Sequence, residues 1–173
     1  MSNDKIDKVW RNRYAKKYKN ILLFDLGANH GKFSTGFIRT KNVDAYLIEP
    51  NSKLIPKLEE TFKKNGEKTK VINKLAWIDN SVQKFLIGTN KDNTNSMSAV
   101  IQQEFKNNKG KFLKDYVEVE SLNISQFIKD KHNSKYDFVI VKMDIEGSEW
   151  IVIDKMLKDE TFKLIDVLLI EYH

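Results

Sequence analysis

The sequence predicts an α/β fold, a three-layer sandwich in which helices cover both faces of a central, mostly parallel sheet. Apolar runs typical of buried strands alternate along the chain with stretches whose apolar residues recur at helical spacing. Turn-forming residues separate these stretches. The 173 residues suffice for one domain with a sizeable core, and neither an internal repeat nor a second domain is evident.

The predicted elements follow this alternation from residue 21 onward. Strands are expected at Ile21–Leu26, Asp44–Pro50, Lys70–Trp77, Val82–Thr89, Tyr116–Leu122, Tyr136–Asp144 and Ile165–His173, and a surface loop at Asn90–Ala99. Helices are expected around Phe33 and Phe37, from Asn51 or Ser52 to Gly66, around Ile124 to Ile128, and over Ser148–Leu157. In the strand that begins at Tyr116, alternation predicts that Val117 and Val119 point inward.

Composition excludes several classes of function. The chain has no cysteine, so disulfides, thiol catalysis and thiolate metal sites are ruled out. Its apolar runs fall well short of the ~20 residues that span a bilayer, and its polar start is not typical of a signal peptide. We therefore expect a cytoplasmic protein without a membrane partner.

Residues 1–20 form a basic segment distinct from the domain at 21–173. They carry seven Lys or Arg and two Asp residues, which is most of the net charge of +6. Trp10, Tyr14 and Tyr18 recur every four residues and would share one helical face. Such a segment either binds nucleic acid or another polyanion, or packs its aromatic face on the domain while its lysines stay in water. The second interpretation is favoured because solvated charge runs are common.

The stretch DLGANHG, which follows the first strand, predicts a cofactor turn. Gly27 and Gly31 leave bare backbone that a ligand can approach closely. A dinucleotide fold would instead have the pattern G-x-G-x-x-G, whereas Asn29 stands at the middle glycine. Asp25 would repel a pyrophosphate but attract the sulfonium and ammonium groups of S-adenosylmethionine. Glu49 lies at a spacing that suits the ribose of either cofactor, so the turn is what discriminates.

The stretch VKMDIEGSEW forms the end of an interior strand, at the edge where open α/β sheets bind their ligands. Alternation places Lys142 and Asp144 on one face, and Gly147 allows close approach of the backbone. Stabilisation by a helix N-terminus explains Glu149 and, less directly, Glu146. It explains Asp144 less well, which makes Asp144 a candidate for chemistry.

Five segments in this order and spacing resemble the FkbM family of S-adenosylmethionine-dependent methyltransferases: FDLGANHGKFS, LIEPN, NKLAW, VKMDIEGSE and LLIEYH. The resemblance covers about Ile21 to His173. It implies a class I methyltransferase (Rossmann-like) fold and O-methylation, often of sugar or other small-molecule hydroxyls. By motif, the cofactor turn would comprise Asp25, Gly27, Ala28, Asn29 and Gly31. Glu49 would hold the ribose, and Asp144 would lie near the transferred methyl group. The residues beside the adenine would be Ala76, Trp77 and Asp79.

Methyl transfer to a hydroxyl requires alignment of the reactants and removal of a proton. Asp144, Glu171 and His173 are the candidate bases, all expected at carboxyl ends of strands, and Lys142 beside Asp144 is a further catalytic candidate. The same three candidate bases are competent ligands for a divalent cation that would acidify the hydroxyl. Carboxylates at strand ends often serve hydrogen bonding alone, so we assign no metal ligand.

The class I fold continues after its fifth strand with a helix and a closing hairpin, which this sequence lacks. Its final strand would then be an open edge, and we expect a trimmed or minimal protein that self-associates through it into a homo-oligomer.

Three functions remain open: an O-methyltransferase acting on a small molecule or glycan, an RNA methyltransferase (ribose 2′-O) whose basic arm binds phosphates, and a cofactor-binding module without turnover.

Overall fold

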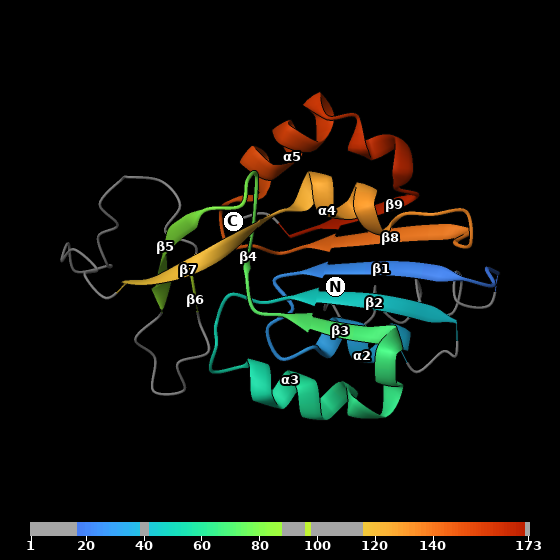
Figure 1. The fold of residues 1–173 in the computed structure, drawn as a ribbon, viewed down its shortest axis with the longest axis horizontal. Helices are drawn as coiled ribbons and strands as arrows, with labels where there is room; N and C mark the ends of the chain where they lie inside the picture. Colours follow the sequence, from blue (N-terminus) through green and yellow to red (C-terminus); the bar gives the residue numbers. More distant parts are fainter. Residues whose placement is uncertain (1–16, 39–41, 88–95, 98–115, 172–173) are drawn as a thin grey trace.

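The computed structural model describes residues 17–38, 42–87, 96–97 and 116–171. Its main sheet has five strands in the order β3–β2–β1–β8–β9, and every neighbouring pair is parallel. The strands are β1 (Ile21–Leu26), β2 (Val43–Ile48), β3 (Thr69–Ile72), β8 (Phe138–Met143) and β9 (Val167–Ile170). Because they are parallel, their carboxyl ends meet at one edge of the sheet (Figure 1).

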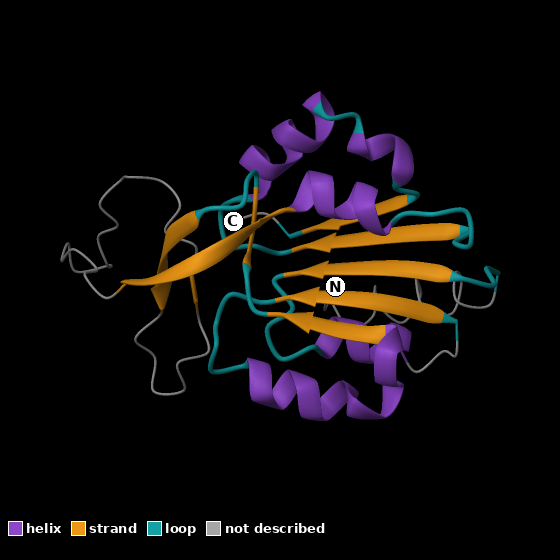
Figure 2. Cartoon of the chain, viewed as in Figure 1, coloured by secondary structure: helices purple, strands orange, loops and turns teal. Residues whose placement is uncertain are grey.

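Helices cover both faces of this sheet, as predicted (Figure 2). One face packs on α4 (Ile124–Lys131) and α5 (Glu149–Lys158), and the other on α2 (Lys32–Ile38) and α3 (Ile55–Phe62). The central strand β1 is buried along its whole length, with alternate residues entering the two cores. Two-sided burial explains why this strand is a continuous apolar run in the sequence.

A second, smaller sheet lies beyond the carboxyl edge of the first (Figure 1). It has the order β4–β7–β5–β6, with β4 (Leu75–Trp77), β5 (Val82–Ile87), β6 (Ser96–Met97) and β7 (Tyr116–Asn123). The single strand predicted at Lys70–Trp77 is therefore wrong: β3 pairs with β2, whereas β4 pairs with β7. Asn73 lies between the two strands, and its side-chain amide donates to the backbone carbonyls of Glu49 and Pro50.

Three smaller predictions are corrected. Ser96–Met97 pairs with β5 inside the expected loop. Val117 is 40% exposed rather than inward, because this end of β7 projects away from the helices of the main sheet. Helix α3 begins at Ile55, and the side chain of Asn51 accepts from the amide of Lys53 in a turn ahead of the helix. Gly66 has the expected positive φ, within a 3-10 helix at Lys63–Lys68.

The basic segment is described only from Lys17 onward. Tyr18 stacks on Phe138 with ring centroids 3.9 Å apart, so this aromatic residue packs on the domain. Trp10, Tyr14 and most of the basic groups lie outside the described residues, and binding of nucleic acid through residues 1–20 stays a prediction.

The described part of β9 pairs with β8 alone, as expected for an edge strand. Self-association through this edge stays a prediction. None of the described helices is long and apolar enough to cross a membrane.

Candidate functional site

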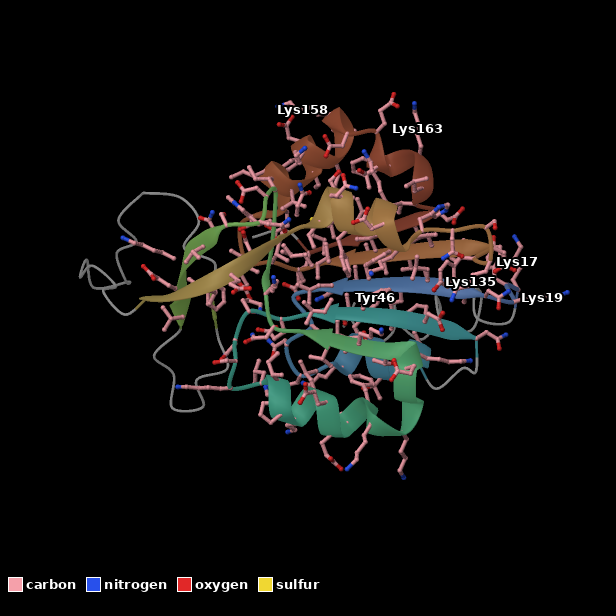
Figure 3. The ribbon with its side chains drawn as sticks, in the orientation of Figure 1. Lys17, Lys19, Tyr46, Lys135, Lys158 and Lys163 are labelled. Carbon is pink, nitrogen blue, oxygen red and sulfur yellow. The ribbon has the colours of Figure 1, made fainter. Side chains whose placement is uncertain are left out.

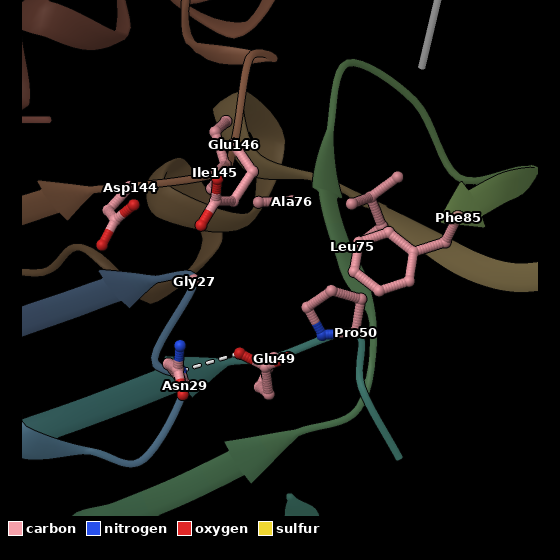
Figure 4. A pocket seen from close by; sticks show the side chains of 10 residues that line it. All are labelled: Gly27, Asn29, Glu49, Pro50, Leu75, Ala76, Phe85, Asp144, Ile145 and Glu146. Carbon is pink, nitrogen blue, oxygen red and sulfur yellow. Dashed lines mark hydrogen bonds between the residues drawn. The ribbon is translucent and has the colours of Figure 1, made fainter. Parts of the chain in front are cut away.

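A pocket opens at the carboxyl edge of the main sheet, facing the smaller sheet (Figure 4). It encloses about 410 Å³ of space, which includes open solvent at its mouth. Its lining residues come from five places along the chain. These are the glycine turn (Gly27, Asn29), the end of β2 (Glu49, Pro50), β4 (Leu75, Ala76), β5 (Phe85) and the loop after β8 (Asp144, Ile145, Glu146). The pocket thus joins the two motifs that the sequence singled out.

The glycine turn between β1 and α2 forms one wall. Gly27 has φ +75°, and a Cβ atom at this position would overlap the carbonyl oxygen of Asp144, so only glycine fits. Asn29 also has a positive φ, 49°, and lines the pocket. Ala28 and Gly31, also expected to contact the cofactor, do not line it. Ala28 is buried in the core, and Gly31 allows close packing against Leu58 and Phe62.

Glu49 connects this turn to the end of β2. One carboxylate oxygen accepts from the backbone amide of Asn29 at 2.7 Å (Figure 4). The other accepts from the backbone amide of Asn51 at 2.8 Å. Glu49 is only 3% exposed. Burial raises the pKa of its carboxyl above the ordinary value, although the two amides oppose this rise. The carboxylate lies in the pocket wall, where the resemblance placed a ribose ligand.

Asp25 lies beneath the pocket and not in its lining. It is fully buried, and the hydroxyl of Ser34 donates to its Oδ2 at 2.6 Å. The Nζ of Lys142 lies 3.4 Å from its Oδ1. Burial raises the pKa of Asp25, and the charge of Lys142 opposes that rise. Within the fold, the carboxylate has a hydrogen bond from Ser34 on one oxygen and an ion pair with Lys142 on the other, and it is not part of the pocket lining.

Lys142 and Asp144 lie together, as the alternation of β8 predicted. The ammonium of Lys142 donates to Oδ2 of Asp144 at 3.1 Å and to the carbonyl of Gly27 at 2.9 Å. Asp144 lines the pocket, with its side chain 25% exposed. Of the candidate catalytic groups that the structure describes, Asp144 is the one that lines the ligand space.

The loop that follows Asp144 is shaped by Glu149, the first residue of α5. The carboxylate of Glu149 is buried and accepts from the amides of Ile145 and Gly147 at 2.9 and 3.0 Å. Glu146 and Gly147 both have positive φ, 56° and 99°, so this loop is held in a conformation that most residues avoid. Glu149, at the N-terminus of α5, thus holds this loop by hydrogen bonds, and its negative charge there agrees with the helix-dipole interpretation.

The opposite wall of the pocket is apolar and comes largely from the smaller sheet. Ala76 lines it, as expected, but Trp77 packs into the core and Asp79 is exposed and accepts from the hydroxyl of Ser81. Sequence reasoning missed five lining residues: Pro50, Leu75, Phe85, Ile145 and Glu146. Pro50, Ile145 and Glu146 adjoin residues already singled out, so their motifs could have suggested them. No local signal marks Phe85, which reaches the pocket only through the pairing of β5 with β7.

Of the two remaining candidates, the structure describes Glu171 alone, and it does not line the pocket. Glu171 follows β9, is exposed, and donates its backbone amide to the carbonyl of Met143 at 2.9 Å. His173 lies outside the described residues. Among the residues that the structure describes, no group of three potential ligands could hold a metal ion.

The family model for the methyltransferase FkbM domain matches residues 25–173. This chain belongs to the FkbM methyltransferase family. With the strand order β3–β2–β1–β8–β9, membership confirms the predicted class I methyltransferase fold. No curated protein sequence matches the chain.

Several solved structures resemble the chain, and two of them are methyltransferases. One is a precorrin-6y C5,15-methyltransferase from Geobacter metallireducens, with 10% identity and a TM-score of 0.45, covering 92% of this chain. The other is an rRNA methylase from Streptococcus thermophilus, with 7% identity and a TM-score of 0.49, covering 99% of this chain. The FkbM chain spans 58% of the first structure's length and 72% of the second's.

S-adenosylmethionine, the cofactor that the family implies, fits the chemistry of this pocket. Its lining carries three carboxylates, from Glu49, Asp144 and Glu146, and none of the described lining residues is Lys or Arg. Such a set suits a cationic ligand and would repel a pyrophosphate. Leu75, Ala76 and Phe85 offer an apolar wall of the kind that binds a flat heterocycle.

Proposed function

We propose that this FkbM chain is an S-adenosylmethionine-dependent O-methyltransferase that acts on a hydroxyl group of a small molecule or glycan. The observation that carries the proposal is the position of Asp144. Its carboxylate lines the same pocket as the glycine turn and Glu49. A proton acceptor and a cofactor cradle that share one pocket are what methyl transfer to a hydroxyl needs.

The binding roles follow from the lining. Each carboxylate oxygen of Glu49 accepts one hydrogen bond from a backbone amide. Each oxygen therefore keeps a lone pair that can accept from a ribose hydroxyl. Gly27 presents bare backbone at the end of β1, and Asn29 follows it in the pocket lining. Leu75 and Phe85 would cover the face of the adenine and exclude water from it.

S-adenosylmethionine, when bound, supplies a methyl group already activated by its sulfonium leaving group. The chain's own residues then align the acceptor and take its proton. Asp144 is the proposed acceptor of that proton, since it is partly exposed to the pocket. The lysine beside it donates a charged hydrogen bond of 3.1 Å to this carboxylate.

The cofactor is tested first by thermal unfolding of the 173-residue chain with S-adenosylhomocysteine, S-adenosylmethionine or NAD. A ligand at ~100 times its dissociation constant stabilises the native state by about 2.7 kcal/mol, a rise in Tm of roughly 5–10 °C. We expect this rise with the two sulfur compounds and none with NAD. The absence of any rise with the sulfur compounds would contradict the proposed cofactor.

The role of Asp144 is tested by Asp144→Asn with radiolabelled methyl donor and a panel of small alcohols and glycans. We expect turnover to fall by about 10²-fold or more, since positioned proton transfer contributes this much. Affinity for S-adenosylhomocysteine should stay within about threefold, because the substitution keeps the shape of the side chain. Wild-type binding without transfer to any acceptor would favour the cofactor-binding module over the enzyme.

A further inference from the structure

One largely buried cation joins the two loops that form the cofactor side of the pocket. The ammonium of Lys142 donates to the carbonyl of Gly27, in the glycine turn, and to the carboxylate of Asp144, in the loop after β8. These loops are in direct contact, because a Cβ atom at Gly27 would overlap the backbone of Asp144. Lys142 thus connects two walls that are 115 residues apart in sequence.

The third partner of Lys142 lies below the pocket. Oδ1 of Asp25 lies 3.4 Å from Nζ of Lys142. Among the buried side-chain nitrogens and oxygens of the described residues, this Oδ1 is the one without a hydrogen-bond partner. An ammonium group has three N–H donors, and three oxygens surround this one. The side chain of Lys142 is 14% exposed and that of Asp25 is wholly buried.

The arrangement uses the acidic residue of the glycine turn in an unexpected way. The sequence suggested that Asp25 attracts a cationic cofactor, but its carboxylate faces Ser34 and Lys142 beneath the pocket. The pocket itself retains the carboxylates of Glu49, Asp144 and Glu146. The charge of Asp25 is therefore paired with Lys142 and not presented to the ligand space.

We propose that Lys142 is a positioning residue that holds the glycine turn and the Asp144 loop at the separation that the cofactor pocket requires, with Asp25 as its buried counter-ion and not a cofactor ligand. The proposal rests on the proposed function for its ligand. Buried ion pairs add little stability relative to apolar groups of similar volume, so a neutral pair can preserve the fold. The neutral pair lacks the cation that bridges the loops.

The test compares Asp25→Asn/Lys142→Met, Asp25→Asn and wild type in the full chain. Hydrogen exchange at the amides of Asp144 and Ile145 reports how firmly the loop is held, because these amides bond to Leu26 and Glu149. Calorimetry measures the affinity for S-adenosylhomocysteine. Lys155→Met is the matched control, since it removes a lysine bonded to Asp159 at the far end of α5.

For the double variant we expect a Tm within a few degrees of wild type, at least tenfold faster exchange at both amides, and at least tenfold weaker binding. Asp25→Asn keeps Lys142 and its bonds to Gly27 and Asp144, so its affinity should stay within about threefold. The lysine control should match wild type in both measurements.

Wild-type exchange rates in the double variant would overturn the proposal, whatever the ligand does. A tenfold loss of affinity in Asp25→Asn would overturn it too, because Asp25 would then act on the ligand directly. This single variant also decides the case if the double variant does not fold. Failure of wild type to bind the ligand would refute the proposed function instead, and the exchange comparison would still decide the role of Lys142.

Discussion

Each end of the main sheet carries an ion pair between a lysine and an aspartate, but the two pairs differ in how far they are exposed to water. At the carboxyl edge, Lys142 lies among Asp25, Asp144 and the carbonyl of Gly27, and its side chain is 14% exposed. At the amino edge, Lys135 donates to Asp44 at 2.8 Å, but its side chain is 58% exposed (Figure 3). Both are Lys–Asp pairs that join distant segments.

The difference lies in solvation. Water screens the exposed pair, which is worth about 0–1 kcal/mol. Removing one partner of a buried pair costs about 3–5 kcal/mol, because the other charge is left unpaired. Burial by itself lowers the pKa of Lys142, but the charges of Asp25 and Asp144 outweigh it and raise the pKa. The amino edge therefore contributes modestly to stability, whereas the carboxyl edge concentrates buried charge around a ligand space.

The largest effect is expected from alanine substitution of a glycine with positive φ at each end of the sheet, Gly27 at the carboxyl edge and Gly66 at the amino edge. Gly27→Ala should destabilise the fold by about 2–6 kcal/mol, because backbone strain adds to overlap with the backbone of Asp144. Gly66→Ala, at the amino edge, should cost only the strain of about 1–3 kcal/mol, since no atom lies within 4 Å of its added Cβ.

Urea unfolding measures both variants, and the rise in Tm with S-adenosylhomocysteine reports the pocket. Gly66→Ala should keep that rise and Gly27→Ala should lose it. Equal destabilisation by the two substitutions would show that close contact at the carboxyl edge is unimportant.

A smaller effect is expected from the two hydrogen bonds by which Glu149 holds the loop after β8. Glu149→Gln replaces one of the two oxygens that accept from Ile145 and Gly147 by an amide NH₂, so one charged hydrogen bond is lost. We expect a loss of about 1.5–3 kcal/mol in the free energy of unfolding, with weaker binding of S-adenosylhomocysteine. Glu160→Gln, which removes an exposed partner of Lys163, should change stability by less than about 1 kcal/mol. Similar losses in both variants would mean that Glu149 does not hold this loop.

The smallest effect concerns pH and the exposed pair. Partial burial by itself raises the pKa of Asp44, but hydrogen bonds from Lys135 and Tyr136 outweigh it and hold the pKa below its usual value. Ionised Asp44 therefore stabilises the fold above pH ~4, and this stabilisation is lost as pH falls through its lowered pKa.

Asp44→Asn should cost no more than about 1 kcal/mol at pH 7 and progressively less below pH ~4. Urea unfolding at several pH values measures this, and 0.5 M salt should reduce the difference at pH 7. A difference that is the same at pH 7 and pH 2 would contradict the assignment.

Local patterns in the sequence were sufficient for much of the fold. Continuous apolar runs and helical spacing predicted the five strands of the main sheet and its four covering helices, although β3 was extended too far. The helix-spaced residues of α3 and α5 were found because their period needs no knowledge of partners. The start of α3 was misplaced because Asn51, a good helix-capping residue by type, forms a turn instead.

By itself, the sequence determined that Gly27, Glu49 and Asp144 stand at the carboxyl ends of strands. Strand ends in a parallel sheet share one edge, so these residues meet whatever the details of packing. Only the tertiary structure decided that Phe85 closes the pocket and that Asp25 binds Lys142 beneath it. Both depend on pairings between segments far apart in the chain, and such pairings leave no periodic trace in either segment.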